Sequence, residues 1–295
     1  MKGRFWPPAV GVLLLAACAP GSSIPDGEVF LDEEVSLVRG PDVDSAQREF
    51  DVEGNSVVVA LVDEKLTDIR LQLAIIDPGG KASAPIEVEN NLRGAGMEVA
   101  ALTALRDSHI RVTLTGQQDA KTPGHVRLRL RRFDADKHSK FLNSREALRA
   151  WSIATTASYR ADDIRKSGVS DIDRAISGLA SPAGDATLEA QARLIKAHML
   201  RYFHVDWRES RAEARRAVAA FRALPTPDRL GEARAQYAEA LSLMKISVDR
   251  KSVDPTAEEA AKLARETLTA LSADTSAFDA IERRPFDISS LRRLR

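Results

Sequence analysis

The feature that most constrains the fold of this chain is a change in hydrophobic periodicity near Phe133. From about Val35 to Phe133, apolar residues alternate with polar ones, as in DIRLQLAIID and HVRLRLRRF. A period of two is typical of half-buried strands. After Phe133 the apolar residues recur every three or four positions, which is the period of an amphipathic helix. We therefore predict an α+β chain of two domains, with a β half before an α half.

The β half is divided into short segments by sequences that form turns. Seven segments are typical of strands, and EGNS, DPGG, NLRGAG and AKTPG separate several of them. In DPGG, the proline presets φ for a turn and the glycines accept a positive φ. Short strands at this spacing predict an antiparallel β-sandwich, which we place at residues 28–134.

The α half has chemically marked helix starts. At four places a capping residue stands three positions before a glutamate or directly before a proline, which predicts a helix start. These residues are Asn143, Asp206, Thr226 and Asp254. A further start after Asp185 is followed by an apolar stripe at helical spacing, from Leu188 to Met199. We predict antiparallel helix pairs at residues 140–285 and a C-terminal tail at 286–295.

The N-terminus has the layout of a secretory signal. Lys2 and Arg4 precede an uncharged, mostly apolar run over residues 5–17, which is too short to span a bilayer as a helix. Cys18, the only cysteine of the chain, follows this run. We expect residues 1–17 to be removed as a signal peptide and the Pro-, Gly- and Ser-rich residues 18–27 to form a flexible tether.

Leu15, Ala16, Ala17 and Cys18 resemble the bacterial lipobox. The resemblance implies that the Cys18 thiol carries diacylglycerol and that acyl chains such as palmitate hold the mature protein in a membrane. Because Ala19 follows, and not aspartate, it also implies the outer membrane, facing either the periplasm or the surface. Two alternatives stay open: an ordinary signal peptide with a chance cysteine, or a buried free thiol. A lipidated Cys18 leaves the mature chain no thiol for catalysis, a disulfide or a metal.

Four segments of the β half resemble the bacterial pre-peptidase C-terminal domain. They are FDVEGNSVVVAL, LQLAIIDPGG, HIRVTLTG and GHVRLRLRRF, and the resemblance covers roughly residues 46–133. It departs at Ser108 and His109, where that family usually has glycine and tyrosine. The resemblance implies a jelly-roll-like sandwich with a role in secretion, solubility or binding, and it brings no catalytic residues.

The helix pairs are similar to degenerate tetratricopeptide repeats. The starts after Asp185 and Thr226 are about 41 residues apart, longer than that family's 34, and the signature of the first repeat helix is missing. A generic α-solenoid or an irregular bundle is the alternative. A lipobox, a sandwich and such helices together also resemble the non-catalytic N-terminal region of bacterial CHAT-domain proteins. The His and Cys pair of their caspase-like peptidase has no counterpart here.

The sequence contains no recognisable catalytic constellation. There is no G-x-S-x-G elbow, no phosphate-binding glycine loop and no H-E-x-x-H. His198 and His204 are six positions apart, which is not the spacing of two ligands on one helix face, and Asp134, Asp136 and His138 are more typical of a solvated linker than of a cation site. We therefore expect no enzyme activity, no metal and no cofactor. Because 43 basic residues balance 43 acidic ones, nucleic acid is not an expected partner either.

Two groups of side chains are candidates for binding. Tyr202, Phe203 and Trp207 gather at a helix-to-helix turn, and with Tyr237 they are candidate contacts for a partner protein. The alternative is a structural corner in which Phe203 and Trp207 fill the junction. On the last strand, Arg127, Arg129 and Arg131 share a face and are candidate contacts for an anionic polymer or a lipid headgroup, unless they only protect an edge strand from aggregation.

The leading hypothesis is a non-catalytic cell-envelope lipoprotein that acts as a scaffold or adaptor for an unidentified envelope protein. A regulatory part of a CHAT-like peptidase system is the first alternative. A glycan-binding envelope module is the second, although the β half has no tryptophan or tyrosine to stack on sugars.

Overall fold

The structure is a computed structural model of the 295-residue chain. It describes residues 24–37, 45–64, 69–89, 96–116, 125–156, 167–180, 184–203, 205–249 and 262. Cys18 and its lipobox, the cap at Asp254 and the expected tail at 286–295 lie outside these ranges.

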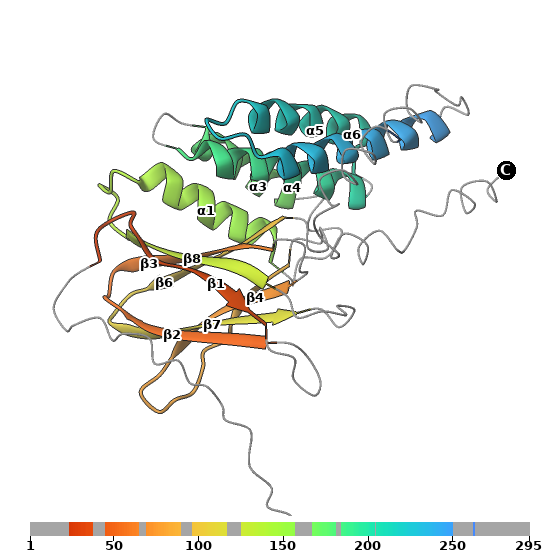
Figure 1. Cartoon of the computed structure of the whole chain (residues 1–295). Coiled ribbons are helices and arrows are strands. Elements are labelled where there is room, and N and C mark those ends of the chain that lie inside the picture. Colours follow the sequence, from red (N-terminus) through yellow and green to blue (C-terminus); the bar gives the residue numbers. More distant parts are fainter. Residues whose placement is uncertain are drawn as a thin grey trace, which may run out of the picture.

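Eight strands form two four-stranded antiparallel sheets that pack as a sandwich (Figure 1). One sheet has the order β1 (Val29–Ser36), β8 (His125–Asp134), β3 (Ser56–Asp63), β6 (Met97–Ala104). The other has the order β2 (Ser45–Val52), β7 (Ser108–Gly116), β4 (Ile69–Ile76), β5 (Ile86–Val88). Apart from β4 and β5, consecutive strands alternate between the sheets, as in a jelly roll. The predicted jelly-roll-like sandwich is confirmed, with the short β5 as a strand that the periodicity did not indicate.

The interior of the sandwich is built from the alternating apolar residues. Leu71 and Leu73 of β4 and Leu128 and Leu130 of β8 are buried there, together with inward-facing residues of β3 and β7. The polar residues between them lie outside, so the period of two corresponds directly to the two faces of each sheet.

Strand β3 is buried on both faces. Val58, Ala60 and Val62 point into the sandwich, whereas Val57, Val59 and Leu61 belong to a second core with the helices. Its run of apolar residues does not alternate because helix α1 (Leu142–Ala154) covers the outer face of this sheet (Figure 1).

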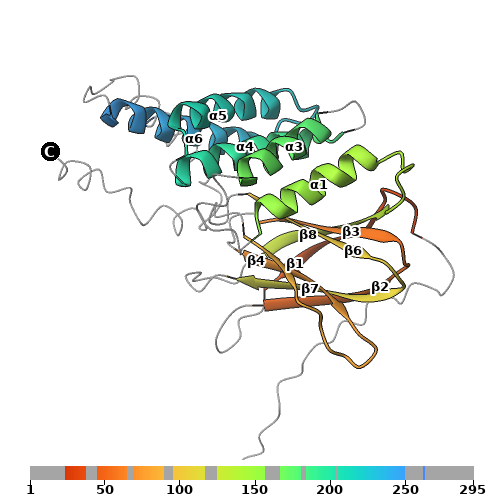
Figure 2. The same cartoon turned by 180° about the vertical axis from the view of Figure 1, so that it is seen from behind.

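The helices form layers on that sheet. α1 lies on the sheet, α3 (Val169–Leu179) and α4 (Ala186–Tyr202) pack over α1, and α5 (Trp207–Arg222) and α6 (Arg229–Asp249) lie outermost, as Figure 2 shows from the opposite side. Small residues such as Ala190, Ala214 and Ala217 let α4, α5 and α6 pack closely around Phe221. No helix in the described ranges is long and apolar enough to cross a membrane.

The start of the described chain is fastened to the corner between β8 and α1. Asp26 accepts hydrogen bonds from the Asp134 backbone N–H (3.0 Å) and from the Ser139 hydroxyl (2.8 Å), and the Gly27 N–H donates to the Arg132 carbonyl (2.8 Å). The prediction of a flexible tether is therefore wrong for residues 24–27, because their polar groups are used in this corner.

Arg145 of α1 fixes the same corner from the other side. Its buried guanidinium donates from Nη1 to the carbonyl oxygens of Asp134 (2.5 Å) and Asp136 (2.9 Å). The segment with Asp134, Asp136 and His138 is thus a hydrogen-bonded turn, where the sequence predicted a solvated linker.

The predicted helix starts are partly correct. The carboxylates of Asp185 and Asp206 cap α4 and α5, and Asp206 Oδ1 accepts from the backbone N–H of Arg208 and Glu209. The prediction is wrong for Asn143, which lies inside α1, because the helix begins one residue earlier after Phe141 with no side-chain cap. It is also wrong for Thr226, because Asp228 accepts from the Gly231 N–H (2.8 Å) at the start of α6.

Candidate functional site

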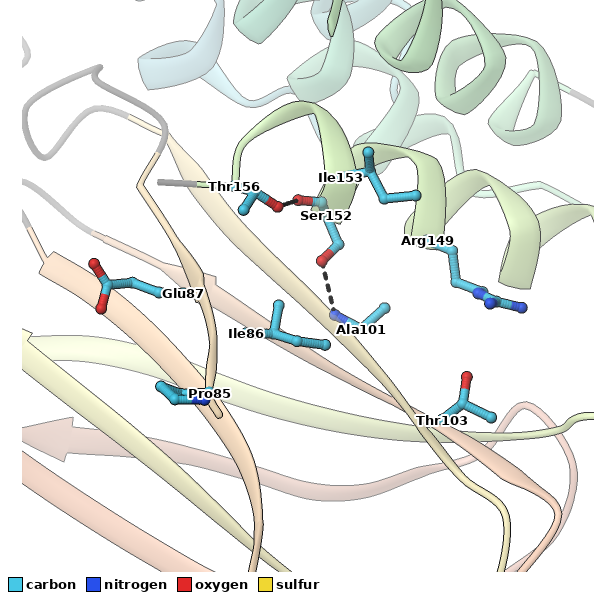
Figure 3. A pocket seen from close by; sticks show the side chains of 9 residues that line it. All are labelled: Pro85, Ile86, Glu87, Ala101, Thr103, Arg149, Ser152, Ile153 and Thr156. Carbon is cyan, nitrogen blue, oxygen red and sulfur yellow. Dashed lines mark hydrogen bonds between the residues drawn. The ribbon is translucent and has the colours of Figure 1, made fainter. Parts of the chain in front are cut away.

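A groove on the open side of the sandwich, between β5, β6 and α1, is the candidate site (Figure 3). It encloses about 670 Å³, which is within the range of ligand sites in proteins. Its lining residues are Pro85, Ile86, Glu87, Ala101, Thr103, Arg149, Ser152, Ile153 and Thr156.

One face of α1 forms the upper wall. Arg149, Ser152, Ile153 and Thr156 are spaced so that they share a face of the helix and its last turn. The opposite face, with Trp151, packs into the core between the sheet and the helices. The core therefore fixes the orientation of the groove residues. Ile153 is 47% exposed and lies in the lining of the groove.

The groove lies where both sheets have an edge, and the end of α1 bridges the two. β6 is the last strand of one sheet and β5 the last strand of the other. The Ala101 N–H of β6 donates to Ser152 Oγ (3.0 Å), and the Glu89 N–H, just after β5, donates to the Thr155 carbonyl (3.0 Å). Ala101, Ser152 and Thr156, which take part in this bridge, also line the groove.

The backbone of β6 presents polar groups to this groove. In an antiparallel pair, the N–H and C=O of a residue point either toward the neighbouring strand or away from it, in alternation. Since the Ala101 N–H reaches Ser152, residues 101 and 103 direct their backbone groups away from β3. Within the described part of the chain, no strand pairs with this side of β6. The N–H and C=O of Thr103 and the C=O of Ala101 therefore face the groove.

The two charged residues of the groove differ in how firmly they are held. Glu87 accepts a 2.5 Å hydrogen bond from Gln72 and lies 3.3 Å from Arg70, so its carboxylate is neutralised within its own sheet. Arg149 is 44% exposed and has a long contact of 3.5 Å with Glu146. Its guanidinium is available to a carboxylate of a bound molecule.

Two of the three hydroxyl groups of the groove, on Ser152 and Thr156, have structural roles. Ser152 Oγ accepts from the Ala101 N–H, and Thr156 Oγ1 donates to the Ser152 carbonyl (2.9 Å). The nine lining residues include no histidine, lysine or cysteine that could activate a nucleophile. Across the described ranges, no group of three or more His, Cys, Asp or Glu side chains is arranged to hold a metal ion.

The structure places the three candidate arginines on the helix side of the β1–β8–β3–β6 sheet, where β8 is an inner strand. An edge-strand role is therefore wrong for them, because β1 covers that side of β8. Arg127 forms a two-pronged ion pair with Asp32 (2.7 and 2.8 Å). Arg131 donates to the Gly27 carbonyl and stacks on Phe133, and burial lowers its pKa. Arg129 stands between them with no ion pair in the described structure.

The candidate aromatic residues do not form one surface. Phe203 packs against the core between the sheet and the helices, whereas Tyr237 packs beside Ala240 and Met244 of α6. Trp207 begins α5, with the Lys245 ammonium 5.9 Å from its ring centroid. Tyr202 ends α4, and its side chain lies outside the described part.

The groove was not predicted from the sequence. Its residues come from three segments whose proximity depends on the order of strands, and β6 and β5 follow each other along the chain without pairing. One signal was available, the Arg149, Ser152, Ile153 and Thr156 face, where polar residues accompany a single exposed isoleucine. Comparisons of the chain with protein-family models, with curated proteins and with solved structures find no match.

Proposed function

We propose that this chain is a non-catalytic, lipid-anchored envelope protein that binds a partner polypeptide in the groove between β5, β6 and α1. It would act as a scaffold or adaptor at the outer membrane. The observation that carries the proposal is the combination, in one groove, of a strand edge that no described strand pairs with, an exposed isoleucine and a loosely held arginine.

The chemistry of the groove supports binding of a polypeptide. Backbone donors and acceptors on β6 match those of another chain, and mixed apolar and charged contacts are typical of protein interfaces. Helices α3 and α4 pack into the same apolar core as α1, so a second surface of the tetratricopeptide-like kind on them would be held at a fixed position relative to the groove.

The anchor part of the proposal depends on Cys18 and on the apolar run before it. Intact mass and membrane fractionation of the native chain, beside Cys18→Ser, test it. We expect cleavage before Cys18, added acyl mass and sedimentation with outer membranes for the native chain alone. Soluble, unmodified forms of both chains would contradict the anchor.

Site-specific photo-crosslinking in envelopes tests the binding part. A photoreactive residue at Ile153 lies in the groove, whereas one at Asp51 lies exposed on β2, on the outer side of the other sheet. We expect a discrete adduct from Ile153 in the anchored protein and none of that mass from Asp51. The proposal fails if Ile153 gives no adduct in several growth conditions, or if both positions give the same products.

A further inference from the structure

We infer that the partner enters the groove as an extended segment, which pairs with the open side of β6 and becomes a fifth strand of the β1–β8–β3–β6 sheet. This inference rests on the proposed function and adds the class of ligand, an extended peptide with an apolar residue and an acidic residue two positions apart.

The backbone of β6 carries the first step of the argument. The Thr103 N–H and C=O and the Ala101 C=O point into the groove, where the described chain offers them no strand. Strand addition satisfies such groups with main-chain hydrogen bonds, and side-chain contacts then decide which sequence binds.

Ser152 limits the length of the added strand. Its hydroxyl already occupies the Ala101 N–H, which is the donor that a longer partner strand would need next (Figure 3). Pairing therefore ends at Ala101 and is centred on Thr103. The same contact protects part of this edge from indiscriminate pairing with other chains.

The wall of α1 sets the spacing of side chains. Ile153 and Arg149 are four residues apart on a helix, a rise of about 6 Å at 1.5 Å per residue. Residues i and i+2 of a strand point to one side about 6.6 Å apart. A strand lying along α1 therefore places one side chain beside Ile153 and the next on that side beside Arg149. These positions favour an apolar residue and a carboxylate, while the intervening residue faces Ile86.

A blocked heptapeptide, acetyl-Thr-Val-Ile-Asp-Ile-Val-Thr-amide, is the probe, because a valine lies two positions from the aspartate in both chain directions. Two comparison peptides isolate the contacts: one with N-methyl groups on the central residues, which removes the strand donors, and one with lysine replacing aspartate. Binding is followed by NMR on residues 18–295 carrying Cys18→Ser. We expect the Thr103 amide to exchange about ten-fold more slowly when the probe is bound, and the Ala101 amide to change little, since Ser152 already holds it.

Two variants at one position separate the backbone from the side chain. Thr103→Pro removes a backbone donor that faces the groove and not β3, and an edge strand tolerates proline at such a position. Thr103→Val keeps the backbone N–H. We expect Thr103→Pro to weaken probe binding about ten-fold or more and Thr103→Val to bind as the parent does, with unchanged circular dichroism in both. Arg149→Gln should remove the preference for the aspartate peptide over the lysine peptide.

Any one of three results would overturn the inference. The first is equal binding of the probe and its N-methylated form, and the second is equal binding of the probe to Thr103→Pro and to the parent. The third is no binding at millimolar probe. Crosslinking from Ile153 in a Thr103→Pro background separates the two proposals. An adduct that persists there keeps the proposed function and rejects strand addition, whereas no adduct even in the parent rejects both.

Discussion

At the scale of single residues, Arg145 holds the corner between the sandwich and the helices. It is 4% exposed, and its guanidinium satisfies two backbone carbonyls of the turn that connects β8 to α1. A buried charge in such a position is stabilising only while its partners stay in place, and its removal leaves those carbonyls without donors.

We expect Arg145→Met to lower the free energy of unfolding by about 2–4 kcal/mol, because the Asp134 and Asp136 carbonyls lose charged donors. Urea denaturation measures the effect. Arg149→Met, one turn further along α1 and 44% exposed, is the control and should change stability by less than about 0.5 kcal/mol. Equal effects of the two substitutions would contradict the role of Arg145.

His109 on β7 predicts a pH dependence. Hydrogen bonds to Glu49 (3.0 Å) and Asp51 (2.9 Å) raise its pKa above the ordinary 6.5. The folded state then binds the proton more tightly than the unfolded state, so this stabilisation is complete below the unfolded pKa and is lost as the pH rises through the folded one. His109 is 39% exposed, so the loss should stay below about 1 kcal/mol.

The measurement is the free energy of unfolding from about pH 5.5 to 8.5 for the parent and for His109→Gln. Stability should fall with pH more steeply in the parent than in the variant. Parallel curves, or a parent that gains stability relative to the variant as pH rises, would show that the histidine is not held by these carboxylates.

At the scale of elements, the helix caps show why some helix starts were predicted correctly and others were not. Asp206 and Thr226 each stand at an expected helix start, yet only Asp206 caps a helix with its side chain, because α6 begins later and uses Asp228. Both residues are of types that cap helices. Whether such a residue does so depends on its own backbone angles, which its place in the sequence does not reveal.

We expect Asp206→Ala to cost about 1 kcal/mol, because the backbone N–H groups of Arg208 and Glu209 lose their acceptor. Thr226→Ala should change stability by a few tenths of that amount at most. Thermal unfolding followed at 222 nm compares the two, and a larger loss for Thr226→Ala would mean that α6 is capped differently in solution.

The sheets and helices themselves were predictable because their periodicity is local. The alternation of Leu71 and Leu73 and the spacing from Leu188 to Met199 depend only on neighbours in sequence. The groove was not predictable. β6 lies at the edge of its sheet because its neighbour β3 pairs on the other side with β8, about seventy residues away in sequence. The pairing of β8 with β1, also far apart in sequence, places Arg127, Arg129 and Arg131 on an inner strand and not on an edge.

At the scale of the whole molecule, the sandwich and the helices share one core. Val57, Val59 and Phe133 of the sheet pack with Leu148 and Trp151 of α1, and this cluster continues into α3 and α4. The β half and the α half are therefore joined by buried apolar surface. We expect them to unfold together.

Phe133→Ala tests this coupling. The side chain is fully buried between β8 and α1, so its loss should cost about 3–5 kcal/mol. We expect the helical signal at 222 nm and the amide NMR signals of β3 in the sandwich to be lost together at lower denaturant, in one transition. Two separated transitions, with the helical one unchanged, would show that the halves are independent. Ala82→Gly, on the exposed turn between β4 and β5, is a control outside this core.

The fastened residues 24–27 also set how far the molecule can stand from a bilayer. Ile24 is only six positions after Cys18, so the chain between them reaches at most about 20 Å when fully extended. Ile24 is tied to Arg132 and Gly27 lies against Phe141, at the start of α1, whereas the groove follows the last turns of that helix, which is about 20 Å long. A lipid on Cys18 would therefore confine the groove to within roughly 40 Å of the membrane surface. Any polypeptide that uses the groove must belong to that thin layer or send a chain into it.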